Sequence, residues 1–145
     1  MSSTNDSGDR TFVDSNVLVY AHDLDAGEKH QRAADIVREL WEHRNGSLST
    51  QVLQEFYVNV TRKIPRKLGK STGRELTRNY SSWKTETIDS ADVLRASEIE
   101  ESSRIGFWDA LIIVAASKSG ASRVLSEDFN PGQTIAGVTV EDPFV

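Results

Sequence analysis

The sequence predicts an α/β fold in which a parallel sheet is covered by helices on both faces. Stretches of strand length alternate with stretches of helical periodicity, which is typical of such folds. Residues 11–19 form an almost unbroken apolar run, as expected for a strand buried on both faces. Residues 107–119 are apolar nearly all round, which indicates a helix at the centre of the molecule.

The first half of the chain is predicted to contain two strands, each followed by a helix. Residues 11–19 are the first strand and residues 28–43 are a helix with one apolar stripe. A short strand over residues 47–49 leads into a helix over residues 51–63, for which Thr50 is the expected N-cap.

The middle of the chain adds two helices and one strand. The run Thr72-Gly73-Arg74-Glu75 matches a capping box, which predicts a helix over residues 73–83. Residues 84–88 alternate weakly between polar and apolar and are expected to form a strand. Ser90 is then the expected cap of a helix over residues 91–103.

The last third of the chain is predicted to complete the sheet. The central helix over residues 107–119 is followed by Gly120, a residue that commonly ends helices. Residues 122–126 read as a buried strand, and residues 133–140 as one or two further strands.

Composition narrows the class of protein. The 145 residues suit one domain, expected over residues 11–145 after a disordered polar tail at residues 1–10. The sequence has no run of eighteen apolar residues, so a membrane-spanning helix is not expected. The polar N-terminus does not resemble a secretory signal. The absence of cysteine excludes disulfides and thiolate chemistry. These features favour a cytoplasmic protein.

Charge is distributed unevenly along the chain. The net charge is −5, yet residues 62–84 hold eight basic residues and one acid, which gives this segment +7 and the rest of the chain −12. Such a local basic segment fits the binding of a polyanion, although a solvated loop and helix face would explain it equally well. The candidate contacts are Lys63, Arg66, Lys67 and Lys70. Trp83, beside basic neighbours, is a candidate for stacking on a nucleobase.

Four acidic residues occur where a simple solvated surface explains them poorly. Asp14 and Asp128 end predicted buried strands, so both are expected at the carboxyl edge of one sheet, where α/β proteins bind ligands. Glu55 borders the apolar face of its helix, and Asp109 lies in the first turn of the central helix. Carboxylates gathered in this way repel unless a cation neutralises them, and an all-oxygen ligand set favours Mg²⁺ or Mn²⁺.

Each acid also has an alternative explanation on its own. Asp109 is stabilised by the dipole of its helix, by about 0.3–1 kcal/mol, and Asp128 precedes a turn. The run Asp14-Ser15-Asn16 is similar to the Asp-x-Asp of haloacid dehalogenase phosphatases, but Asn16 stands where their second acid is needed. The dispersed histidines, His22 among them, do not suggest a general base.

The four acids together, in their apolar contexts, resemble the PIN-domain family of metal-dependent ribonucleases, and in particular the VapC-like toxins of toxin–antitoxin modules. The resemblance covers residues 11–145. The matching stretches, in order, are FVDSNVLVY with Asp14, QVLQEFYVNVTRK with Glu55, FWDALIIVAA with Asp109, and VLSEDFNPGQTIAGVTVEDPF with Asp128.

The resemblance implies an α/β/α sandwich whose acidic site holds Mg²⁺ or Mn²⁺ and hydrolyses RNA, often transfer RNA, with metal-activated water. Asp14, Glu55, Asp109 and Asp128 would be the catalytic and metal-binding acids, supported by Asn16 and Ser126. Glu127, next to the fourth acid, could share its role. The resemblance also implies a protein antitoxin and a homodimer of toxins. A PIN fold that binds RNA or protein without cleaving it is the alternative.

Overall fold

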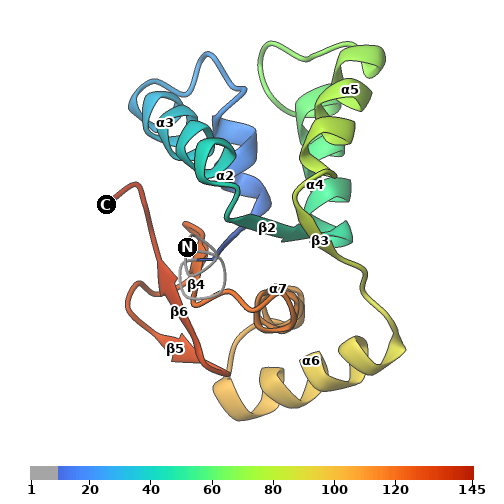
Figure 1. The fold of residues 1–145 in the computed structure, drawn as a ribbon, viewed down its shortest axis with the longest axis vertical. Helices are drawn as coiled ribbons and strands as arrows, with labels where there is room; N and C mark the ends of the chain where they lie inside the picture. The colour runs from blue at the N-terminus through green and yellow to red at the C-terminus, as the bar shows by residue number, and fades with distance from the viewer. Residues whose placement is uncertain (1–9) are drawn as a thin grey trace.

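The computed structural model describes residues 10–145, and in these residues a six-stranded sheet lies between two layers of helices (Figure 1). The strand order is β3-β2-β1-β4-β6-β5, and all neighbours are parallel except β5 and β6, which are antiparallel. The strands are β1 (Thr11–Val13), β2 (Gly46–Ser49), β3 (Lys84–Glu86), β4 (Arg123–Leu125), β5 (Thr134–Ile135) and β6 (Val138–Glu141).

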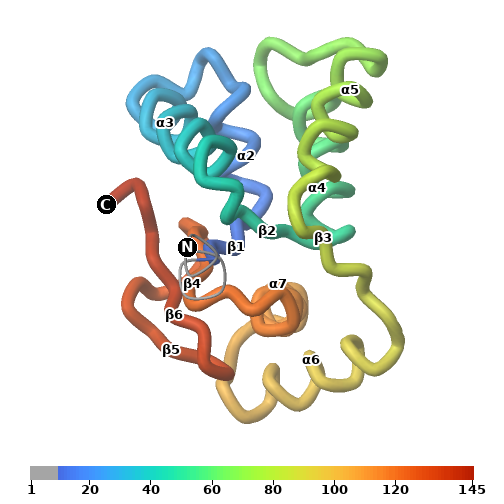
Figure 2. Tube along the Cα trace, viewed as in Figure 1, coloured from blue at the N-terminus to red at the C-terminus, as the bar shows by residue number. Residues whose placement is uncertain are grey.

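The helices divide between the two faces of the sheet. Four cover one face: α2 (Ser15–Tyr20), α3 (Glu28–His43), α4 (Thr50–Arg62) and α5 (Lys70–Tyr80). Two cover the other: α6 (Ser90–Ser103) and α7 (Phe107–Lys118). Figure 2 shows α2 with α3 and α4 with α5 as two neighbouring pairs above the strands. The predicted three-layer α/β class is therefore confirmed. Within residues 10–145, no helix is long and apolar enough to cross a membrane.

The predicted first strand is wrong beyond Val13, because Asp14 ends the strand and starts a helix. Asp14 has extended backbone angles (φ −74°, ψ 159°), and its side chain accepts a hydrogen bond from the Ser15 N–H at 2.7 Å, so it is the N-cap of α2. The apolar residues that resembled a strand face the core from this helix, with Val17 and Leu18 fully buried. A helix thus begins directly at the carboxyl edge of the sheet.

Three other helix starts differ from their predicted positions by one or more residues. Ser49, and not Thr50, caps α4, because its hydroxyl accepts the Val52 N–H at 3.3 Å. Asp89, and not Ser90, caps α6, where it forms a reciprocal capping box with Asp92. Helix α5 begins at Lys70 rather than within the proposed capping box at residues 72–75.

Helix α7 occupies the centre of the core, as its composition predicts. Its residues from Ala110 to Ala116 are all buried, and it packs against β2, β4 and β6 on one side and α6 on the other. The last strands depart from a purely parallel sheet, because β5 and β6 form a hairpin whose turn contains Gly137 at φ 82°. The predicted tail, residues 1–10, lies outside the described residues except Arg10, whose carbonyl accepts the Ser122 N–H at 3.1 Å.

Candidate acidic site

The four acids singled out in the sequence come from four separate elements. Asp14 follows β1 and Asp128 follows β4, and these two strands are parallel neighbours, joined beyond Val13 by the Asp14 N–H donating to the Leu125 carbonyl at 3.0 Å. Glu55 lies in the second turn of α4, and Asp109 lies in the first turn of α7. Asp14 and Asp109 each lie close enough to Glu55 and Asp128 for the charges of those two acids to raise their pKa values.

Ser126 joins the two acids that follow β1 and β4. It is fully buried, and its hydroxyl donates to Asp14 Oδ2 at 2.7 Å. Ser126 Oγ in turn accepts hydrogen bonds from the Asp128 N–H at 3.1 Å and from Asn16 Nδ2 at 3.3 Å. Asn16 Nδ2 also donates to Asp128 Oδ2 at 3.1 Å. The residues predicted to support the acids, Asn16 and Ser126, therefore touch them directly.

Glu55 is held by two residues that the sequence analysis did not select. The Ser15 hydroxyl donates to its Oε1 at 2.9 Å, and Gln51 Nε2 donates to its Oε2 at 3.2 Å. Gln51 Nε2 also lies 3.4 Å from the carbonyl oxygen of Trp108, the neighbour of Asp109. The Gln51–Glu55 contact could have been found from its i, i+4 spacing on one helix. The Ser15 contact joins residues forty positions apart and has no signal in the sequence.

Burial and mutual repulsion both act on these carboxyl groups. Burial raises the pKa of Asp14 most strongly, hydrogen bonds from Ser126 and Ser15 lower it, and the charges of Glu55 and Asp128 raise it, to about 7 overall. Burial also raises the pKa of Asp109, with the charges of Asp128 and Glu55 adding to the effect. A cation among the four carboxylates would oppose both shifts, because it favours the charged form of each acid.

Glu127, adjacent to Asp128, forms its hydrogen bonds with residues other than the four acids. Its carboxylate accepts from Tyr20 Oη at 2.6 Å and from Lys29 Nζ at 2.9 Å. Partial burial raises its pKa, but the hydrogen bonds from Lys29 and Tyr20 outweigh this effect and lower the pKa overall. Glu127 is thus paired with residues of α2 and α3, and its share in the role of Asp128 stays a prediction.

The donor set fits a hard divalent cation. Two further oxygens beside the carboxylates, Asn16 Oδ1 and Gln51 Oε1, are buried without a hydrogen-bond partner in the described chain. Buried acceptors of this kind are rare, and an ion or the water it carries would satisfy them. No three His, Cys, Asp or Glu side chains within residues 10–145 form a ready-made ion-binding group. Mg²⁺, however, commonly takes only one or two protein carboxylates and keeps several waters.

The predicted RNA contacts lie outside this cluster. Lys63, Arg66, Lys67 and Lys70 are exposed at the end of α4, in the loop after it and at the start of α5. Arg66 also forms an ion pair with Asp25 at 3.3 Å, in the loop before α3. The basic segment therefore flanks the connection between α4 and α5 rather than the acids themselves.

The sheet therefore carries acids from four elements at its carboxyl edge, where α/β proteins bind ligands. The PIN domain family model matches residues 11–133, and the chain therefore belongs to the PIN domain family. No curated protein matches the chain.

Several solved structures share the fold. A toxin–antitoxin complex from Klebsiella pneumoniae has a TM-score of 0.66 at 17% identity, covering 92% of this chain and 97% of that one. DNA-bound VapBC from Salmonella typhimurium has a TM-score of 0.64 at 16% identity, covering 93% and 98%. Mycobacterium tuberculosis VapC20, described as a toxin that cleaves the sarcin-ricin loop, has a TM-score of 0.58 at 18% identity, covering 79% and 86%.

Proposed function

We propose that this chain is an Mg²⁺- or Mn²⁺-dependent endoribonuclease and the toxin of a toxin–antitoxin pair. The observation that carries the proposal is the meeting of Asp14, Glu55, Asp109 and Asp128 at the carboxyl edge of a PIN-fold sheet. Like charges at one site, two of them with raised pKa values, are typical of functional rather than structural positions.

In this proposal the four acids hold the ion, and their neighbours hold the acids. Ser126 and Asn16 fix Asp14 and Asp128 relative to each other, while Ser15 and Gln51 fix both oxygens of Glu55. When bound, the ion supplies activation of water and neutralises charge that develops during phosphoryl transfer. The fixed carboxylates limit the positions that the ion can take, which is the condition for in-line attack on a phosphodiester.

The substrate and the partners follow from the same proposal. The basic segment at Lys63, Arg66, Lys67 and Lys70 would bind the phosphates of an RNA, transfer RNA or another structured RNA being the first candidates. One solved structure of similar fold is a toxin–antitoxin complex. We therefore expect a protein antitoxin that covers the acidic site, and a toxin that forms a homodimer.

The central test is cleavage of RNA by the purified chain in Mg²⁺ or Mn²⁺, with and without EDTA. Cleavage of total RNA, with the cut sites mapped, should require the cation and should disappear in Asp14→Asn. This variant keeps the size of the side chain and replaces a carboxyl group whose pKa lies near neutrality, so it is expected to fold. Added Mn²⁺ should raise the Tm of the wild type and not that of Asp14→Asn.

The control is Asp35→Asn, which removes a carboxylate that pairs with Arg38 on the exposed side of α3. It should cleave RNA and respond to Mn²⁺ like the wild type. Cleavage that persists in EDTA, or equal cleavage by Asp14→Asn, would refute the metal-dependent mechanism. Binding of RNA without any cleavage would instead favour a non-cleaving PIN module.

A further inference from the structure

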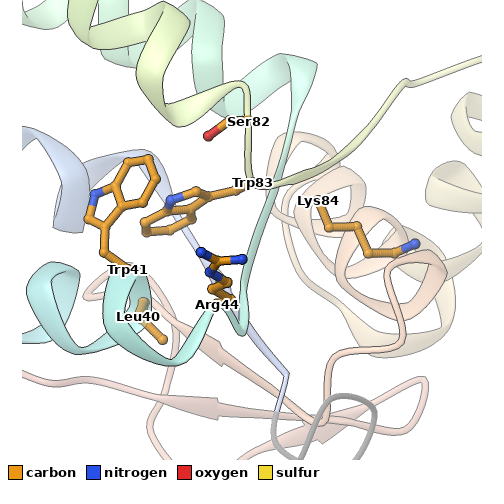
Figure 3. Close-up of a pocket in the computed structure, with 7 residues that line it drawn as sticks. Leu40, Trp41, Arg44, Ser82, Trp83 and Lys84 are labelled. Atoms are coloured by element: carbon orange, nitrogen blue, oxygen red, sulfur yellow. The ribbon is translucent and has the colours of Figure 1, made fainter. Parts of the chain in front are cut away.

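A second polar and aromatic site lies at the other edge of the sheet. A hollow of about 430 Å³ opens where β2 and β3 begin (Figure 3). Asp14 and Asp128, by contrast, lie where β1 and β4 end. We call it the indole hollow, and its lining residues are Leu40, Trp41, Arg44, Gly46, Ser82, Trp83 and Lys84. Its volume falls within the range of small-ligand sites and would take one nucleotide unit.

Two indoles form one wall of the indole hollow. The rings of Trp41 and Trp83 lie 5.2 Å apart in an edge-to-face arrangement, and Figure 3 shows them next to each other. Trp83 is only 8% exposed, so it cannot itself be the stacking surface that the sequence suggests. Trp41 is 40% exposed and packs on Tyr80 at 6.0 Å, which supports the ring and leaves part of it open. The available aromatic surface is therefore that of Trp41.

Trp83 also carries a hydrogen-bond donor that is fully buried and therefore closed to a ligand. Trp83 Nε1 is buried and has no partner within the described residues. A buried indole N–H normally finds an acceptor. Gly46 lies against the same ring, since a Cβ at this position would be 2.6 Å from Trp83 Cε3. The close approach of the backbone fixes the Trp83 ring in the hollow.

The charge of the indole hollow is positive. Its two ionisable lining residues are Arg44 and Lys84, and no acid lines it. Arg44 is exposed and forms no ion pair or hydrogen bond within residues 10–145. Lys84 points away from the indoles in Figure 3 and lies 3.7 Å from Glu86. Arg44 is therefore the main free cation beside the aromatic surface.

Arg44 has a backbone conformation that is uncommon for arginine and that Arg104 shares at the end of α6. Arg44 ends α3 in the left-handed conformation, at φ 54°, a position at which Gly or Asn is favoured. An arginine there keeps a charge in the lining of the indole hollow at a position where its backbone is not the preferred one. The same fact supplies a clean variant, because Arg44→Asn removes the charge and suits the backbone.

We propose that the indole hollow binds an unpaired nucleotide of a single-stranded RNA, with the base on Trp41 and the phosphate on Arg44. Aromatic rings beside cations are the usual combination for single-stranded nucleic acid. A second copy of the chain would bring the same cations and no acid from this surface. An apolar helix would find little aliphatic surface, because Leu40 is almost fully buried. The inference rests on the proposed function and gives its substrate a second point of attachment.

The test separates binding at the indole hollow from cleavage. The protein is Asp14→Asn in EDTA, so that no RNA is cut, and the probes are octaadenylate, a base-free polyphosphate of similar charge, and octaglutamate. Trp41→Ala should weaken octaadenylate binding between about fivefold and a hundredfold, as expected for one lost stacked base, and leave polyphosphate binding unchanged. Arg44→Asn should weaken both, and Trp41→Phe should restore most of the octaadenylate affinity.

Arg95→Gln is the matched control, since it removes one exposed charge from α6 in the opposite helix layer. It should leave the affinity for octaadenylate within twofold. The proposal is overturned if Arg44→Asn and Trp41→Ala bind octaadenylate like their parent, if no octaadenylate binds, or if octaglutamate binds equally well through the same residues. Cleavage by the wild type is measured separately, so its loss would refute the proposed function and not this site.

Discussion

At the scale of single residues, Ser126 forms hydrogen bonds with three residues of the acidic site. Its hydroxyl has one donor and two acceptor positions, and the contacts with Asp14, Asp128 and Asn16 occupy all of them. The residue thus links strand β4 to the start of α2 without any exposed surface. Removing it affects three groups at once.

We predict that Ser126→Ala lowers the free energy of unfolding by about 1–3 kcal/mol, because buried partners lose their hydrogen bonds. The pKa of Asp14 should rise further, since the Ser126 hydrogen bond lowers it. Cleavage should fall and need more Mn²⁺. Urea unfolding and a Mn²⁺ titration of activity measure both effects. Ser119→Ala, a buried serine beside Ser47 in the core, should lose stability only; an equal loss of activity there would contradict the role of Ser126.

His22 provides a prediction on pH that is independent of the acidic site. Its ring lies against Phe56 and Tyr80, with Nε2 2.7 Å from Tyr80 Oη. Burial lowers its pKa, and the charge of His30 lowers it further. The unfolded chain therefore binds a proton below about pH 6.5 that the folded chain resists, so stability should fall as the pH drops through this value.

In His22→Gln this part of the pH dependence should vanish. The unfolding free energy at pH 8 minus that at pH 5.5, measured with urea, should be lower for this variant than for the wild type, since the raised pKa of Asp14 contributes with the opposite sign and equally to both proteins. His43→Gln, on the exposed end of α3, should keep the difference of the wild type. An unchanged difference in His22→Gln would exclude His22 as its source.

The limits of the sequence are clearest at these residues. The order of the four acids and the support from Asn16 and Ser126 follow from motifs and from the rule that parallel strands share a carboxyl edge. The Ser15–Glu55 contact depends on how α2 crosses α4, which no local pattern encodes. The sequence alone does not decide which of the adjacent acids, Glu127 or Asp128, belongs to the acidic site. The two differ in the structure, where Glu127 contacts Tyr20 and Lys29.

At the scale of elements, the error at β1 and α2 has a physical cause. The β-branched residues Val17 and Val19 are common in strands, and Val17 is fully buried, as it would be in a central strand. The pattern Asp-Ser-Asn is also an N-cap signal, and the cap prevails because it satisfies the first N–H of the helix. Helix α7 was predictable because its apolar run is too long for a strand.

At the contact between α4 and α5, the side chain of Thr61 determines whether Gly73→Ala stabilises or destabilises the protein. A Cβ on Gly73 would lie 2.6 Å from Thr61 Cγ2, and a hydrogen bond from Thr61 Oγ1 to the Tyr57 carbonyl, 2.7 Å long, holds that side chain. Gly73→Ala gains about 1 kcal/mol of helix propensity but should lose about 1–3 kcal/mol to overpacking, so the variant should be less stable.

Thr61→Ser removes the methyl group that a new Cβ would meet. In that background Gly73→Ala should become neutral or stabilising, because only the gain in propensity remains. A double-mutant cycle by urea unfolding measures the coupling. Additive effects of the two substitutions would show that another contact determines the cost.

At the scale of the whole molecule, charge is separated between one basic segment and an acidic remainder. Residues 62–84 carry +7 while the chain as a whole carries −5. Long-range attraction of RNA to the end of α4 and the following loop, and repulsion from other surfaces, would orient the first encounter. Such orientation depends on ionic strength, because salt screens charges that lie far apart.

Replacing Lys63, Arg66 and Lys67 together by Gln should therefore reduce the slope of log affinity for RNA against log salt by about 1.5–2, since each lost phosphate contact changes it by about 0.7. Arg66 should contribute least, because Asp25 already pairs with it. Binding by Asp14→Asn in EDTA at several salt concentrations measures the slope. Replacing Arg32, Arg38 and Arg95 removes the same charge elsewhere, and an equal change in slope there would exclude a specific role for the loop.

The sheet ends at both sides in very short strands, β3 with three residues and β5 with two. An edge strand exposes unpaired N–H and C=O groups to which another chain can add, and short edges that begin with a charge offer little length for such pairing. Lys84 opens β3, and the hairpin turn at Gly137 limits β5. The folded protein should therefore resist polymerisation by strand addition. At high protein concentration it should not form amyloid-like aggregates as long as it stays folded.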